Sequence, residues 1–355
     1  MGKACFQAVR YKLAAPAPAT LVSVGNENMK IQGENSAHVF IHQGASWYLP
    51  YTLRTCLKSD PGTRVILIGE KNDSAKIEFA NIADFRETPA VREFNLAYIH
   101  LSTNPEDYEK FCFQRWFYLL ELMRRRGLDS VLHHDSDVLF LSTLDRVRKA
   151  YGESLDYAAV CMVPDEDIIA VPRLHTSGHS SYWTRPALED FCRFLIQSYV
   201  ENEHREELLE MWRQYKAVHP SGGICDMTLI SNFVHSSPGR VGNLLEIRNA
   251  SSFDPGLHLG HGSARDIYQM ENGVKVIQRN GDDYFFVREK SGEAVKALAI
   301  HFQGENKKLI PDYYRGGFDW GIWRERLKRN FEESIFKKAE KKIRKLRKNL
   351  FKPGS

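Results

Sequence analysis

The sequence contains no hydrophobic run that approaches the roughly 20 apolar residues of a membrane-spanning helix. It also lacks an apolar N-terminal segment of the kind that directs secretion. Its six cysteines show no Cys-x-x-Cys spacing, which argues against a zinc site and against a disulfide framework. We therefore expect free, buried thiols and a cytoplasmic protein. No internal repeat of fixed period is present.

What the chain does have is enough apolar residues for one large α/β domain. Of its 355 residues, 43% are hydrophobic and 12% are aromatic. The formal net charge of +4 is unevenly distributed, because residues 324–352 hold thirteen Lys or Arg and four Glu. That segment carries +9, which leaves −5 for the rest of the chain. We expect an N-terminal extension (1–36), a globular domain (37–320) and a basic helical tail (321–355).

The tail has the pattern of an amphipathic helix. Lys and Arg fill one face, and the other carries an apolar stripe of Phe331, Ile335, Ala339, Ile343, Leu346 and Leu350. Such a helix binds anionic lipid, with each basic residue near the surface contributing about 1 kcal/mol. We expect residues 324–352 to bind the cytoplasmic face of a membrane. Docking on the chain's own domain and pairing between copies of the chain stay open, and nucleic acid is a less favoured partner.

Strands and helices are expected to alternate, which predicts a mostly parallel, doubly wound sheet with flanking helices. For the long helix, Asn104 is the expected cap, Pro105 the first helical residue and Gly127 the stop. Strands are predicted at 37–42, 64–69, 96–101, 157–163 and 297–301, and helices at 49–57, 104–126, 185–199, 203–214 and 227–234. Asn272-Gly and Asn280-Gly predict hairpins within 267–290.

Two carboxylates, Asp135 and Asp137, follow the apolar end of a predicted strand at Val131–Leu132. In extended backbone, residues i and i+2 point to the same side, so both side chains are expected to converge at the carboxyl end of this strand. Two like charges that close repel each other unless a cation lies between them, and hard oxygen ligands favour Mg²⁺ or Mn²⁺. The alternative is an ordinary turn-capping aspartate.

A second motif surrounds the last predicted strand. His301 stands at the strand end, Gly304 follows three residues later, and Lys307 three residues after that. A neutral imidazole is suited to be the third metal ligand, the glycine lets backbone approach a phosphate, and the lysine supplies charge to a diphosphate. Taken alone, a histidine such as His301 is more often an ordinary strand-end residue than a metal ligand.

Together these motifs resemble the retaining glycosyltransferases of family 8, the glycogenin and galactosyltransferase group, over residues 37–310. His301-Phe-Gln-Gly304-Glu-Asn-Lys307 is similar to their C-terminal motif, and Asp135-Ser136-Asp137 to their Asp-x-Asp. The resemblance implies the GT-A nucleotide-sugar fold, a metal held by Asp135, Asp137 and His301, and a contact of Ser136 with the donor. Three features depart from the family. Met227 stands where the family carries an amide, Lys308-Leu309 stands where it carries Pro-Trp, and His133-His134 is an unusual lead-in to the acidic pair.

The resemblance also implies donor contacts from Val39, Ile41 and Gln43 on the first strand and from Arg115 on the long helix. A surface arginine with a packed stem is the alternative for Arg115.

The sugar and acceptor side is expected to contain His175, Gly178, His179 and Trp183. Asp226 is expected there as an acceptor-side carboxylate that orients a hydroxyl or removes its proton. Trp183 is equally consistent with a core residue, and Asp226 with a helix N-cap.

We therefore expect a metal-dependent enzyme that moves a hexose from a nucleoside diphosphate sugar, UDP-linked, to a glycan, glycolipid or protein acceptor. Retention of configuration is implied by the resemblance alone. One alternative is a nucleotidyltransferase, which shares the sheet and the metal carboxylates but consumes a nucleoside triphosphate. Another is a non-catalytic protein that binds glycan or nucleic acid through the tail.

Overall fold

The computed structural model describes residues 35–72, 74–163, 176–264 and 267–315. The predictions made for residues 1–34, for His175 and for the basic tail lie outside these residues. Within the described part of the chain, no helix combines the length and the apolar character that crossing a membrane would require.

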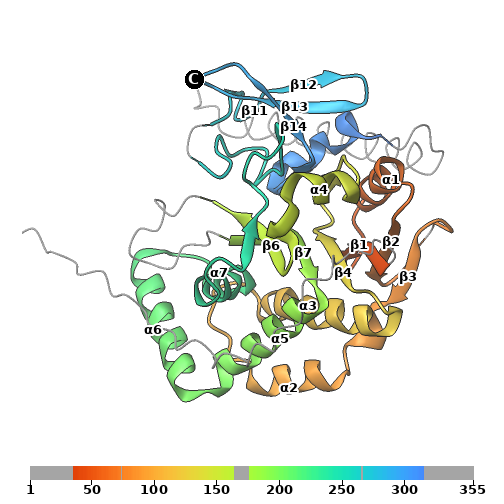
Figure 1. The fold of residues 1–355 in the computed structure, drawn as a ribbon. Coiled ribbons are helices and arrows are strands. Elements are labelled where there is room, and N and C mark those ends of the chain that lie inside the picture. The colour runs from red at the N-terminus through yellow and green to blue at the C-terminus, as the bar shows by residue number, and fades with distance from the viewer. Residues whose placement is uncertain (1–34, 73, 164–175, 265–266, 316–355) are drawn as a thin grey trace, which may run out of the picture.

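A seven-stranded sheet forms the centre of the domain (Figure 1). Its spatial order is β3 (Glu78–Asn81), β2 (Arg64–Gly69), β1 (Ser36–Ile41), β4 (Ser130–His134), β7 (Thr176–Thr184), β6 (Ala158–Met162) and β8 (Val241–Asn243). Only β7 runs antiparallel to its neighbours, and the other adjacent pairs are parallel. The predicted α/β class with a mostly parallel sheet is confirmed.

Helices cover both faces of this sheet because its strands alternate between two hydrophobic cores. Val39 and Ile66 belong to one core, Phe40 and Leu67 to the other. The first core is covered by α2 (Pro89–Ala97), α3 (Glu106–Arg126), α5 (Arg185–Val200) and α7 (Asp226–Ser236), with α6 (Asn202–Val218) packed against α5. The second core is covered by α1 (Leu49–Ser59) and α4 (Leu144–Tyr151), as Figure 1 shows.

A smaller layer of strands packs beyond α1 and α4, at the top of Figure 1. It consists of a four-stranded sheet, β12 (Ile277–Asn280), β13 (Asp283–Val287), β14 (Ala294–Ala297) and β9 (Ser251–Ser252), and a hairpin, β10 (Met270–Glu271) and β11 (Val274–Lys275). Asn272 and Gly273 turn this hairpin with φ of 51° and 79°, as their sequence predicts. Short 3-10 helices occur at Ile82–Phe85, Gly152–Leu155 and Gly304–Tyr313.

One strand pair outside the large sheet positions the candidate site. The strand after the acidic pair, β5 (Val138–Phe140), pairs antiparallel with the late strand β15 (Ala299–His301). In this register His301 lies opposite Val138, and the backbone N–H of Phe302 donates to the carbonyl of Asp137 at 3.0 Å. Two motifs that are about 165 residues apart in the sequence thereby become neighbours.

The helices predicted between residues 49 and 234 are confirmed, and one predicted strand is wrong. The long helix ends at Arg126 with Gly127 in the left-handed region (φ 63°), although it begins at Glu106, after Pro105. The strand predicted at 96–101 does not form, because α2 occupies residues 89–97 with Val91 and Phe94 buried and Leu96 90% exposed. The third parallel strand is β3 instead. A strand that was not predicted, β7, also forms around Gly178.

Four buried histidines make the fold sensitive to acid. Burial lowers the pKa of His38, His133, His134 and His179 below their ordinary value, because a charged imidazole loses its hydration there. The unfolded chain therefore binds more protons below about pH 6.5, where a free histidine titrates. Stability from these groups is present above that pH and is lost as the pH falls through it.

We expect the free energy of unfolding to fall between pH 7.5 and 5.5, by at most about 1.4 kcal/mol per pH unit for each histidine. Urea titrations across this range measure it, and they stay above the range in which ordinary carboxylates titrate. A free energy that does not change between these pH values would contradict the assignment of neutral, buried histidines.

Candidate functional site

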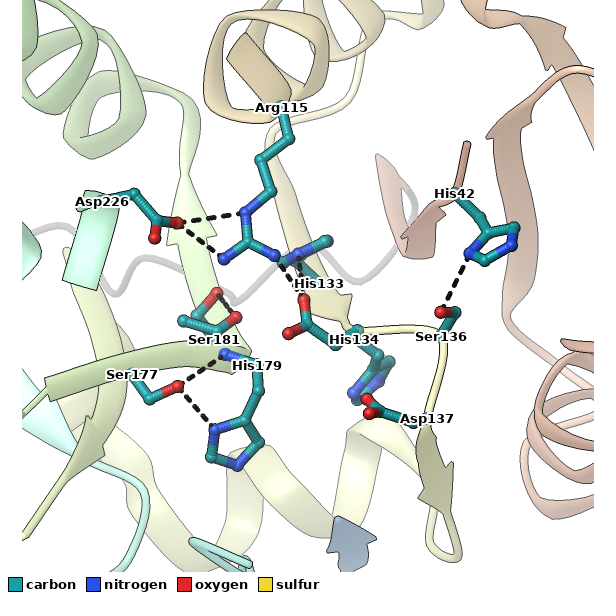
Figure 2. A network of polar contacts seen from close by, with 12 residues as sticks. His42, Arg115, His133, His134, Ser136, Asp137, Ser177, His179, Ser181 and Asp226 are labelled. Atoms are coloured by element: carbon teal, nitrogen blue, oxygen red, sulfur yellow. Dashed lines mark hydrogen bonds and ion pairs between the residues drawn. The ribbon is translucent and has the colours of Figure 1, made fainter. Parts of the chain in front are cut away.

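The candidate site lies where the strand order of the large sheet reverses. From β1 the chain proceeds to β2 and β3 on one side, whereas β4 lies on the other side of β1. Open α/β sheets bind ligands outside the carboxyl ends of their strands at such a point. The residues that follow β1 and β4 meet there, since His42 Nδ1 and Ser136 Oγ are 3.0 Å apart (Figure 2).

The acidic pair forms a turn rather than a continuous strand. The backbone N–H of Val138 donates to the carbonyl of Asp135 at 3.1 Å, which closes the turn between β4 and β5. The i, i+2 rule behind the expected convergence applies only to extended backbone, so it does not hold across this turn. Asp135 and Asp137 each have their own set of partners.

Asp135 contacts the long helix α3. Its Oδ1 lies 2.5 Å from Arg115 Nη1 and 3.6 Å from His133 Nε2, and its backbone N–H donates to the carbonyl of His179 at 2.7 Å. Burial would raise the pKa of the Asp135 carboxyl, but the charge of Arg115 and the contact with His133 outweigh it and hold that pKa well below its usual range. Asp135 is thus held as an anion.

Arg115 connects Asp135 to the second candidate carboxylate, Asp226. Its Nε and Nη2 donate to Asp226 Oδ2 at 3.1 and 2.6 Å, and Trp116 Nε1 donates to the same oxygen at 3.0 Å. Figure 2 shows Arg115 reaching from α3 between Asp226 and the end of β4. Burial alone would lower the pKa of Arg115, and the two carboxylates raise it well above the usual value. The arginine is therefore an internal charge rather than a surface one.

Asp226 is buried and is the first residue of α7, where the helix N-terminus favours a negative charge. The alternative that it serves as the N-cap is wrong, since Cys225 occupies that position and forms a capping box with Thr228. The sequence predicts Asp226 as a carboxylate on the acceptor side. In the structure it belongs to one ion-pair network with Arg115 and Asp135.

Asp137 has partners from the C-terminal motif. Lys307 Nζ lies 2.8 Å from Asp137 Oδ2, and His301 Nε2 lies 3.6 Å from Asp137 Oδ1. His301 Nδ1 donates to the carbonyl of Pro255 at 3.2 Å, so Nε2 of the neutral ring carries a lone pair. This nitrogen faces Asp137 Oδ1 at a distance too long for a hydrogen bond.

The side chains around Asp137 determine whether a divalent metal ion fits here. A histidine ligand usually donates its other ring N–H to a carbonyl or carboxylate, as His301 does to Pro255. Asp137 and His301 therefore have the chemistry of a ligand pair for a hard divalent ion. Within the described residues, no group of three or more His, Cys, Asp or Glu side chains is arranged to hold a metal. The predicted triad with Asp135 is not assembled here, because Arg115 pairs with Asp135.

The remaining residues of the C-terminal motif surround this pair. Gly304 begins the 3-10 helix that carries Lys307 and adopts a left-handed φ of 59°, while a Cβ there would meet open space. Backbone conformation rather than crowding therefore favours glycine. Lys307 Nζ also lies 5.7 Å from the ring centre of Tyr48.

The predicted donor contacts on the first strand need correction. Val39 and Ile41 are buried in the core beneath α3, so their side chains do not face a ligand. The carbonyl of Val39 instead accepts from His133 Nδ1 at 3.2 Å. Gln43 is exposed just beyond the strand, and its neighbour His42, which we did not predict, is the residue that reaches Ser136.

The prediction that Gly178, His179 and Trp183 contact the sugar is also wrong, because all three residues are buried. Trp183 is fully buried beside Trp116 and Phe191. Gly178 is a buried residue of β7 that Trp116 crowds, since a Cβ there would lie 2.5 Å from the indole. Both positions therefore serve packing.

His179 is buried as well, and both of its ring nitrogens have partners. Its Nε2 donates to the carbonyl of Asp254 at 2.8 Å, and its Nδ1 accepts from Ser177 Oγ at 2.8 Å. Its ring stacks on His301 with centres 4.1 Å apart, which makes it a support for that histidine.

Comparison with known proteins gives structural resemblances only. No protein-family model and no curated protein matches the chain. Among solved structures, the galactosyltransferase LgtC in complex with donor and acceptor sugar analogues is 16% identical, with 62% of this chain and 76% of that chain covered and a TM-score of 0.35. Mouse xyloside xylosyltransferase 1 is 9% identical, with 59% and 84% covered and a TM-score of 0.39.

The bifunctional glycosyltransferase WbbM is 12% identical, with a TM-score of 0.46. The match covers 82% of this chain and 52% of that one. These structures are glycosyltransferases by name, and at such scores they assign this chain to no family.

Proposed function

We propose that this protein is a metal-dependent glycosyltransferase that moves a hexose from a UDP-linked donor to a glycan, glycolipid or protein acceptor. The observation that carries the proposal is the environment of Asp137 at the point where the strand order reverses. Nε2 of His301 faces one of its oxygens at 3.6 Å, and the ammonium of Lys307 faces the other at 2.8 Å. These groups suit a hard cation and a phosphate, the two charged parts of a nucleotide-sugar complex.

Asp137 and His301 would hold Mn²⁺ or Mg²⁺, with Asp135 as the further carboxylate. The bound ion would supply positive charge to the diphosphate oxygens, which become more negative as the bond to the sugar breaks. Lys307 would place its ammonium against the same diphosphate, and Gly304 would let the backbone approach it. Each of these groups acts by stabilising charge on the leaving group.

Arg115 and Asp226 would act on the sugar side. The arginine donors fix Asp226 Oδ2, so the carboxyl group is held in one orientation where it can accept a hydrogen bond from a sugar hydroxyl. Retention of configuration rests on the family resemblance alone. For an inverting reaction, Asp226 is our candidate general base.

Calorimetric titration with UDP-glucose and UDP-galactose, in the presence and absence of Mn²⁺, tests the proposal. We expect binding that requires Mn²⁺, followed by release of UDP when a panel of glycan acceptors is added. Release of pyrophosphate from a nucleoside triphosphate would support the nucleotidyltransferase alternative instead. No affinity for any UDP-sugar, with or without metal, would contradict both the proposed donor and the metal.

A further inference from the structure

The small layer of strands contains an ion pair that is completely removed from water. The Lys275 ammonium on β11 donates to Asp254 Oδ1 at 2.5 Å and to the carbonyl of Gly256 at 2.8 Å, and both charged side chains are 0% exposed. The rings of Tyr268 and Phe286 flank the ammonium, with centres 5.4 and 5.6 Å away. None of these residues belongs to the site as predicted from the sequence.

A contribution to the free energy of unfolding does not explain why Lys275 and Asp254 form a buried ion pair. Taking two charges out of water costs several kcal/mol for each ion, and apolar residues of similar volume are often as stable or more so. A buried pair of this kind is better explained by what it holds in place. Asp254 and Gly256, its two acceptors, lie in one short segment, Asp254-Pro255-Gly256, which we call the 254–256 loop.

The 254–256 loop contacts both stacked histidines. Asp254 Oδ2 accepts from the backbone N–H of His301 at 3.0 Å, and the carbonyl of Pro255 accepts from His301 Nδ1 at 3.2 Å. The carbonyl of Asp254 accepts from His179 Nε2 at 2.8 Å. The backbone N–H of Leu257 donates to the carbonyl of His301 at 2.9 Å, which fixes the loop against β15.

We propose that Lys275 and Asp254 are positioning residues that hold the 254–256 loop so that His301 keeps its proton on Nδ1 and directs Nε2 at Asp137. The proton position follows from the Pro255 carbonyl, which can only accept a hydrogen bond. The Pro255 carbonyl is placed by its neighbours on either side, which Lys275 binds. The significance for catalysis rests on the proposed function, because it assumes that Nε2 of His301 binds a metal.

Removing Lys275 would leave Asp254 buried without a counter-charge, and the loop would lose its cross-link to β11. The Pro255 carbonyl would then be held less tightly opposite Nδ1, because only the hydrogen bonds of the loop to His179 and to the backbone of His301 would remain. A free imidazole prefers the tautomer with its proton on Nε2 only slightly, so loss of one hydrogen bond is enough to mix the two forms. A proton on Nε2 would block the lone pair that faces Asp137.

Nitrogen NMR of the metal-free protein labelled at histidine tests the positioning directly. His301→Gln identifies the His301 signals by their loss. We expect the wild type to show His301 with its proton on Nδ1, and Lys275→Met to show both tautomers. A wild-type His301 with its proton on Nε2, or an unchanged tautomer in the variant, would overturn the proposal.

Two further variants separate positioning from folding. Lys275→Met/Asp254→Asn leaves no buried charge but keeps an oxygen for the His301 backbone N–H, so it is expected to fold and still to mix the tautomers. Lys296→Met is the matched control, because Lys296 pairs with Asp283 in the same layer and neither contacts the 254–256 loop. It should leave the His301 signals unchanged.

Binding of Mn²⁺ alone, measured by electron paramagnetic resonance, gives the second readout. We expect the double variant to bind Mn²⁺ about 10- to 100-fold more weakly than the wild type, as when an outer hydrogen bond to a metal ligand is lost, and Lys296→Met to bind normally. Absence of Mn²⁺ binding by the wild type would contradict the proposed function, while the tautomer measurement would still decide the positioning role. Unchanged Mn²⁺ affinity in the double variant would refute that role.

Discussion

Asp137→Asn is expected to abolish Mn²⁺-dependent binding of the sugar nucleotide and to reduce kcat/KM about 1000-fold, the effect of removing one group that stabilises leaving-group charge. The substitution keeps the shape of the side chain but removes the charge that attracts Lys307 and would hold the metal. Lys307 is partly exposed and can be hydrated, so the free energy of unfolding should change by no more than about 1 kcal/mol. Calorimetry, steady-state kinetics and urea unfolding measure the three quantities.

Asp145→Asn is the matched control for this substitution. Asp145 also pairs with a lysine, Lys149, but on an exposed helix surface, so its loss should alter neither donor affinity nor rate. A variant at Asp137 that keeps wild-type affinity and still requires Mn²⁺ would show that the metal is held elsewhere. The proposed site would then be wrong even if the enzyme is a transferase.

The sequence predicts those parts of the fold that depend on local patterns. Gly127 after a long amphipathic run predicts a helix end, and Asn272-Gly273 predicts a hairpin, because both rest on left-handed backbone that few residues tolerate. The strand β7 was missed because its first six residues, Thr176 to Ser181, are small or polar on both faces. It is buried between β4 and β6, where neighbouring strands rather than its own hydrophobicity determine its structure.

The same limit applies to the candidate site. His301 and Lys307 could be associated with the acidic pair by motif, and β15 does bring them to Asp137. The different partners of Asp135 and Asp137 follow from the turn between β4 and β5, which the residue types do not specify. Lys275 and Asp254 carry no sequence signal at all, because a lysine in a short strand is ordinarily exposed and only the packing of the small layer buries it.

Arg115→Met is expected to have the largest effect on stability, a loss of about 3–5 kcal/mol in the free energy of unfolding. The arginine donates two of the three hydrogen bonds that Asp226 Oδ2 accepts and also neutralises Asp135, so its removal leaves a buried carboxylate without a counter-charge. Urea unfolding of the variant measures this loss. Donor binding should fall as well, because both carboxylates lose the group that orients them.

A double-mutant cycle distinguishes the ion pair from simple packing. Asp226→Asn in the Arg115→Met background removes the stranded charge, so it should recover part of the lost stability, whereas additive losses would mean that the two residues act independently. Arg124→Met, on the same helix, is the control, since its pair with Glu189 is exposed and its loss should cost no more than about 0.5 kcal/mol. Equal losses for Arg115→Met and Arg124→Met would contradict a buried network. A larger loss for Arg115→Met, partly restored in the double variant, would mean that one side chain balances the charge of the carboxylates on both sides of the proposed donor.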